Sequence, residues 1–377
     1  MQTRIKNFRN LFLSGFLFLL ISIAEEVPAA NKPSLLNDLQ GSFQGHFGTI
    51  LPHESSIRDA LVQNIGGFEC NLFTKSYGRS AWDSLYRFPE YGIGYVFSTL
   101  GNPDVFGNAH SIFLFLRIDL GNNFRKLGMN YELGLGPAIL TRAFDSIDNP
   151  MNKAISAKLN LFARLKFNVR YRLNEKNKIS LGLSFAHYSN GKVKTPNLGL
   201  NAAYFSLAYS YVLRPERYLQ EHEQPFSSLK KHRFEFYVNT GWKSDDQASD
   251  EIYWIASVVG EYSYTPWKKY AVGCGTDLFY DPSLGPNKLA DWGEPYDRSE
   301  LFQAGIHGSL YARYGRLYLV GQLGVYFYAK YYKYTPFYSR IGLRYELTDR
   351  IKINLTLKSH RTIADFMEWG IGYVFGS

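Results

Sequence analysis

Apolar and polar side chains alternate with a period of two along most of the chain beyond about residue 40. Segment 159–171 shows this best, because its odd-numbered positions are apolar or aromatic and most of its even-numbered positions are polar or basic. The apolar set is Leu159, Leu161, Ala163, Leu165, Phe167, Val169 and Tyr171. Because successive side chains of a β-strand point to opposite faces, the pattern predicts a strand with one apolar and one polar face.

Strand length separates a soluble β-sandwich from a membrane barrel, since both contain such strands. A strand that crosses a membrane at a tilt needs roughly 9 to 11 residues, whereas ordinary strands average about 5 to 6. The alternating segments here are mostly long, and the chain has about sixteen of them, or fourteen if the weaker ones merge: 42–52, 63–75, 88–99, 109–120, 126–141, 155–172, 178–189, 197–213, 231–243, 253–265, 269–280, 299–313, 317–330, 335–346, 350–359 and 366–376. We therefore predict an all-β fold, an antiparallel transmembrane β-barrel of about 14 to 16 strands.

The connections between these segments are alternately short and long. Bacterial barrels keep short turns in the periplasm and longer loops outside. The long connections at 142–154 and 281–298 are therefore expected outside the cell, and both chain termini in the periplasm. The short connections are 122–125, 174–177, 267–269, 314–316 and 348–350.

One long polar connection, 214–230, breaks this rule and divides the chain into two sets of eight segments. Two separate barrels are conceivable. A single closed wall over 30–377 explains the near-continuous alternation more simply. We therefore expect 231–377 to add strands to the wall that the first half begins.

The N-terminal residues indicate export. Arg4, Lys6 and Arg9 precede an uncharged, mostly apolar run at 11–23, and small residues follow it up to about residue 30. This pattern predicts a secretory signal peptide over 1–29. The apolar run is too short to cross a bilayer as a helix, which needs roughly 20 residues. Together with the barrel pattern, the signal peptide predicts the outer membrane of a Gram-negative cell.

The charge of the chain suits an anionic partner. There are 42 basic and 33 acidic residues, a formal net charge of +9, which fits nucleic acid or a phosphorylated membrane surface. Export and the spread of basic residues along barrel strands favour the membrane and argue against nucleic acid. The His residues show no paired spacing typical of a metal site, and the chain has no glycine loop typical of phosphate binding. We expect no metal and no cofactor.

One short motif could carry chemistry. His187 and Ser189 are two residues apart on a predicted strand, so they project from one face, and a hydroxyl beside an imidazole is the minimal arrangement for an activated nucleophile. Their face is the apolar one, and they stand at the strand end, where lipid head groups begin. Asn197 and Asn201 join them from the next strand. The simpler alternative is a strand end running into a polar loop, with Asn190 beginning the turn.

At these residues the sequence resembles the outer-membrane lipid A 3-O-deacylase family (PagL-like), strongest over 41–214. The resemblance rests on His187-Tyr188-Ser189-Asn190-Gly191 and on Pro196-Asn197-Leu198-Gly199-Leu200-Asn201. It implies a serine esterase on the outer wall of a barrel. Ser189 would be the nucleophile, His187 its general base, Asn197 the oxyanion donor, and Asn190 a further oxyanion or substrate contact. Other segments, among them Trp82–Gly94 and Leu357–Phe375, resemble long members of the same group.

The acid of that family falls on Asn201, which is not an acid. An amide can orient an imidazole but cannot neutralise its charged form. Three alternatives follow: Asn201 does this reduced job, a carboxylate from a neighbouring strand such as Glu132 replaces it, or the site is weak.

The resemblance implies a carboxylic ester hydrolase that removes an ester-linked acyl chain from lipid A of lipopolysaccharide in the outer leaflet. Two alternatives stay open. One is a structural barrel with a decayed site. The other is an anion-favouring channel with a wide lumen, which these basic residues would line: Arg164, Lys166, Arg170, Arg340, Arg344 and Lys352.

Overall fold

The computed structural model describes residues 39–76, 81–121, 126–212, 231–244, 251–361 and 363–375. The predicted signal peptide over 1–29, the short turn at 122–125 and the connection at 214–230 lie outside the described residues. Within the described ranges, no helix is long and apolar enough to span a membrane.

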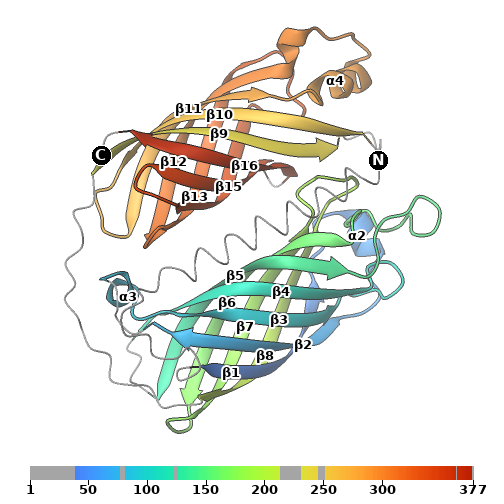
Figure 1. The fold of residues 1–377 in the computed structure, drawn as a ribbon. Helices are drawn as coiled ribbons and strands as arrows, with labels where there is room; N and C mark the ends of the chain where they lie inside the picture. Colours follow the sequence, from blue (N-terminus) through green and yellow to red (C-terminus); the bar gives the residue numbers. More distant parts are fainter. Residues whose placement is uncertain are drawn as a thin grey trace.

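Sixteen antiparallel strands form two closed barrels of eight strands each (Figure 1). The first barrel comprises β1 (Gln40–Ile50), β2 (Ile65–Lys75), β3 (Glu90–Thr99), β4 (Asn108–Asp119), β5 (Leu127–Leu140), β6 (Leu159–Arg172), β7 (Asn177–Ser189) and β8 (Leu200–Val212). The second comprises β9 (His232–Ser244), β10 (Ile252–Tyr264), β11 (Tyr270–Tyr280), β12 (Phe302–Tyr314), β13 (Leu317–Ala329), β14 (Phe337–Glu346), β15 (Ile351–His360) and β16 (Ile363–Phe375). Short helices occupy connections: α2 (Ser55–Asp59), α3 (Ala81–Leu85), α4 (Leu284–Trp292) and the 3-10 helix η2 (Arg298–Leu301).

The all-β prediction and the count of sixteen strands are confirmed, but the prediction of a single wall is wrong. Strand β8 pairs with β1, with Val212 opposite Gln40, so the first barrel leaves no free edge for β9. Strand β9 pairs instead with β16, with Thr240 opposite Trp369. Strands β9 to β16 therefore form a barrel of their own. Alternation repeats in the same way on every strand, so it does not show which strand closes a barrel.

Charged side chains fill both interiors. In the first barrel Arg164 pairs with Glu69 and Glu132, and all three side chains are fully buried. In the second barrel Arg344 Nη1 lies 2.7 Å from Glu261 Oε1. An eight-stranded barrel is just wide enough for side chains to fill its interior. The wide sixteen-strand lumen on which the channel alternative depended does not exist.

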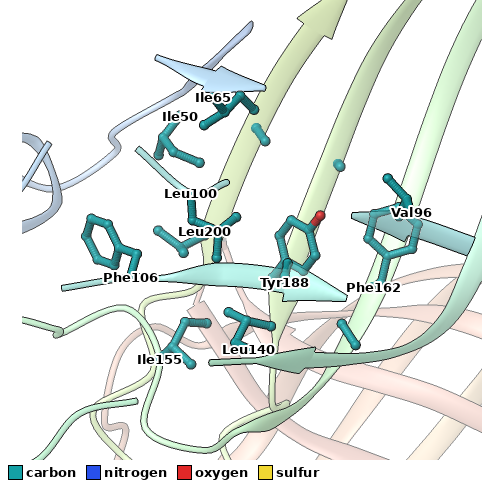
Figure 2. Close-up of a cluster of buried hydrophobic side chains, with 14 of the residues drawn as sticks. Ile50, Ile65, Val96, Leu100, Phe106, Leu140, Ile155, Phe162, Tyr188 and Leu200 are labelled. Atoms are coloured by element: carbon teal, nitrogen blue, oxygen red, sulfur yellow. The ribbon is translucent and has the colours of Figure 1, made fainter. Parts of the chain in front are cut away.

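An apolar cluster closes the loop-bearing end of the first barrel, beneath the connections that follow β1, β3, β5 and β7 (Figure 2). Tyr188 is central to it, with Phe162 from β6 at a ring-centroid distance of 5.3 Å. Because Tyr188 points inward and is 1% exposed, its neighbours His187 and Ser189 must point outward. The cluster thus fixes the end of β7. Its labelled members are Ile50, Ile65, Val96, Leu100, Phe106, Leu140, Ile155, Phe162, Tyr188 and Leu200.

Candidate active site on the outer wall of the first barrel

The end of β7 carries His187 and Ser189 on the outward face of the wall. They continue the alternating row of Leu181, Leu183 and Phe185, each of which is exposed on the outer surface. The placement on the apolar face that the strand pattern predicts is therefore present in the structure. Polar groups on such a face are costly unless they are paired, so their partners decide what this patch can do.

His187 is paired with Asn201. The two residues stand directly opposite each other in the β7–β8 register, and His187 Nδ1 lies 2.7 Å from Asn201 Oδ1. An amide oxygen only accepts, so Nδ1 carries the proton and donates it. In the neutral imidazole, Nε2 is then left with a free lone pair. This is the tautomer that a general base needs.

Ser189 accepts two hydrogen bonds at Oγ. One comes from Asn197 Nδ2 at 2.9 Å and the other from the backbone N–H of Gly191 at 3.2 Å. Both partners donate, so the hydroxyl proton is still available to a base. No hydrogen bond joins Ser189 to His187 among the described residues; such pairs are often long before substrate binds.

Asn190 holds the loop that presents Asn197. Its backbone N–H donates to Asn197 Oδ1 at 3.2 Å, which turns the Asn197 amide group so that Nδ2 faces Ser189. Its own side-chain Nδ2 donates to Ser156 Oγ at 2.9 Å and to the carbonyl of Lys194 at 3.0 Å. The Asn190 side chain is thus directed into the loop scaffold rather than toward Ser189.

Gly199 lets the loop pass close to His187. Its φ is +78°, a backbone conformation that residues other than glycine rarely adopt. A Cβ atom at this position would lie 2.8 Å from His187 Cε1, which is too close for a real contact. The glycine therefore keeps the chain packed against one side of the imidazole ring.

His53, in the connection after β1, completes the chain of hydrogen bonds. Asn201 Nδ2 lies 3.2 Å from His53 Nδ1, and His53 Nε2 lies 3.1 Å from the carbonyl oxygen of Leu198. Sequence reasoning missed this residue, because His53 and Asn201 are 148 positions apart. The strand pattern carries no signal for this contact, because it depends on barrel closure, which puts the end of β1 beside the start of β8: the backbone N–H of Leu51 donates to the carbonyl of Asn201 at 2.7 Å.

Glu132 lies on the other side of the wall. It points into the lumen, is fully buried and accepts from both Arg117 and Arg164. The outward-facing imidazole of His187 therefore has no access to this carboxylate. Among the described residues, no group of three or more His, Cys, Asp or Glu side chains could hold a metal ion.

The second barrel contacts the loop that follows Ser189. Lys192, which is buried, donates from Nζ to the hydroxyl of Tyr334 at 2.8 Å, and its carbonyl accepts from the backbone N–H of Ser244 at 3.2 Å. Thr195 Oγ1 lies 3.2 Å from Ser244 Oγ. The loop is thus held between the two barrels, and Lys194 is its exposed cation.

Two family models match this chain, one for each barrel. Residues 66–210 match the model described as lipid A 3-O-deacylase (PagL). Residues 232–377 match the model described as acyloxyacyl hydrolase, C-terminal domain. The division between the two matches falls between the two barrels, while the first match begins in β2 and leaves out β1. A search of curated proteins found no match.

Solved outer-membrane barrels are also similar to this chain. The crystal structure of the outer membrane enzyme PagL shares 17% identity, covers 46% of this chain and 99% of that chain, and has a TM-score of 0.30. A mutant porin of Rhodopseudomonas blastica shares 8% identity, with 89% and 99% coverage and a TM-score of 0.17. The Acinetobacter baumannii outer membrane protein Omp33 shares 7% identity, with 90% and 99% coverage and a TM-score of 0.18.

Proposed function

This chain belongs to the outer-membrane lipid A 3-O-deacylase (PagL-like) family, and from that premise we propose that its first barrel is an esterase that removes an ester-linked acyl chain from lipid A. Its place is the outer membrane of a Gram-negative cell. The observation that carries the proposal is the His187–Asn201 pair beside the Ser189–Asn197 pair, on the outward apolar face of the wall.

The site stands where lipid A would be. With short turns in the periplasm and loops outside, β7 runs outward and ends at the outer leaflet. Acyl chains would then lie along the exposed row of Leu181, Leu183 and Phe185 below the site. The exposed Lys194 lies in the loop between Ser189 and Asn197, where its positive charge would attract a lipid A phosphate.

In the first half of the reaction, Ser189 Oγ attacks the carbonyl carbon of the acyl ester while its proton passes to His187 Nε2. The negative charge that develops on the carbonyl oxygen is stabilised by N–H donors, for which Asn197 Nδ2 and the Gly191 N–H are placed around Ser189. When the tetrahedral intermediate collapses, the C–O bond to the sugar breaks. His187 gives its proton to the leaving sugar oxygen, which departs as a hydroxyl group.

In the second half, water attacks the acyl-Ser189 carbonyl carbon and passes a proton to His187. Collapse of this intermediate returns the proton to Ser189 Oγ and releases the fatty acid. Asn201 orients His187 throughout but supplies no negative charge to the imidazolium that forms. We therefore expect turnover that depends on Ser189 and is slow for an enzyme of this kind.

Mass spectrometry of lipid A tests the proposal. Cells that express the wild-type chain should contain lipid A that lacks one ester-linked acyl chain, and cells that express Ser189→Ala should not. Folding of both proteins is checked by the shift of the unheated barrel band in gel electrophoresis. If the wild type and Ser189→Ala leave lipid A equally acylated, with both folded, the chain is a structural barrel with a decayed site.

A further inference from the structure

Three hydrogen bonds in a row lead from the outer loop to the imidazole of His187. They join Leu198 O to His53 Nε2 at 3.1 Å, His53 Nδ1 to Asn201 Nδ2 at 3.2 Å, and Asn201 Oδ1 to His187 Nδ1 at 2.7 Å. We propose that His53 is a positioning residue: it fixes the orientation of the Asn201 amide and, through it, the tautomer of His187. This inference rests on the proposed esterase function.

Each bond in the row fixes the direction of the next. The carbonyl of Leu198 can only accept, so His53 Nε2 carries a proton and donates it. In a neutral imidazole, His53 Nδ1 then has a lone pair and accepts from an N–H group. That acceptor selects the amide orientation of Asn201 in which Nδ2 faces His53 and Oδ1 faces His187.

The reverse orientation of Asn201 would be unproductive. With Nδ2 turned toward His187, the Nδ1 atom of His187 would have to accept, and its proton would move to Nε2. Nε2 could then no longer take the proton of Ser189. The asparagine side chain ends in one acceptor oxygen and one donor NH₂ group, so it needs a partner such as His53 to fix which of the two faces His187. A carboxylate accepts at both oxygens and would need none.

The position of His53 is a consequence of barrel closure. Leu51, two residues before His53, donates a backbone hydrogen bond to Asn201 where β1 meets β8. His53 therefore lies beside the first residues of β8. The side chain of His53 is exposed on the loop surface, so burial in a core does not account for it. Its two ring nitrogens instead contact two residues around the candidate site.

The first test is a comparison of His53→Ala with His53→Gln. His53→Ala removes both the donor and the acceptor, and we expect deacylation to fall about tenfold, the effect of losing one orienting hydrogen bond. His53→Gln offers an N–H and a C=O at a spacing similar to that of the two ring nitrogens, and we expect it to retain most of the activity. Equal loss in both variants, or no loss in His53→Ala, would overturn the role of His53.

The second test uses Asn201→Glu as a background. A carboxylate accepts from His187 in either orientation. His53→Ala should therefore lower deacylation much less in this background than in the wild type. If His53 had a purely structural role in the loop, His53→Ala would lower deacylation by the same factor in both backgrounds, which would contradict the proposal.

Ser189→Ala, made in each background, distinguishes a failure of the proposed esterase function from a failure of the role of His53. If deacylation persists in Ser189→Ala, the proposed function fails. If Ser189→Ala abolishes deacylation while His53→Ala equals the wild type, the function stands and only the role of His53 is lost.

Discussion

Lys192, three residues after Ser189, donates a hydrogen bond of 2.8 Å to the hydroxyl group of Tyr334 in the second barrel. Its ammonium group also lies 5.0 Å from the centre of the Tyr334 ring. The loop that presents Asn197 is therefore ordered in part by a barrel that carries none of the candidate catalytic residues. This relationship ties the loop that follows Ser189 to the second barrel.

Tyr334→Phe should lower deacylation about fivefold, because it removes the hydroxyl acceptor and keeps the ring that faces Lys192. Tyr332→Phe is the matched control, since the Tyr332 hydroxyl makes no hydrogen bond among the described residues. The measurement is the fraction of deacylated lipid A at equal protein level. Equal activity of both variants would mean that the Tyr334 hydroxyl does not order the loop.

Asn197→Ala should lower deacylation by about 10² to 10³, the usual effect of removing one donor from an oxyanion hole. Asn197→Asp keeps the shape of the side chain but has no N–H to direct at Ser189 Oγ, so it should lose a similar amount. Rates are compared on purified protein in lipid A micelles. Near wild-type activity in Asn197→Asp would exclude this residue as the oxyanion donor.

Asn201→Glu should raise deacylation, because a carboxylate orients His187 Nδ1 and also stabilises the imidazolium that forms when Ser189 gives up its proton. Replacing the acid by its amide in a serine protease lowers turnover about ten-thousand-fold, which sets an upper limit for the gain. Asn201→Leu, which cannot accept a hydrogen bond, is expected to be inactive. A variant with Glu at 201 that is no faster than the wild type would contradict this account.

Glu132→Gln should destabilise the first barrel by about 3 to 5 kcal/mol, since it removes a buried charge that neutralises Arg117 and Arg164. Glu175→Gln, in the exposed turn between β6 and β7, should change stability little. The free energy of unfolding in urea is measured for both variants. Deacylation per folded molecule should stay unchanged in Glu132→Gln, and a large loss in folded protein would instead make Glu132 the acid.

A tag inserted after Ile147 should be accessible to antibody on intact cells. Ile147 is 86% exposed at the tip of the β5–β6 connection, at the same end of the barrel as Ser189. A tag inserted at Glu175, at the opposite end, should become accessible only after the outer membrane is opened. The reverse result would put the candidate site in the inner leaflet, where lipid A is absent.

The sequence alone determined the strands, their number and the two faces of each strand. Alternation is a local property of neighbouring residues, so the segment at 159–171 shows its strand and its faces without any knowledge of the fold. The same rule placed His187 and Ser189 together on the outward face. The resemblance to the deacylase family was likewise readable from a short motif, and the match to its model confirms it.

Only the tertiary structure decided which strands meet. Closure depends on which edge pairs with which, and the edges at β1 and β8 carry the same alternating pattern as every other strand. For that reason the sequence suggested one wall where there are two barrels. The same closure brings His53 to Asn201 across 148 positions. Contacts of this kind depend on long-range pairing, which the period of two cannot encode.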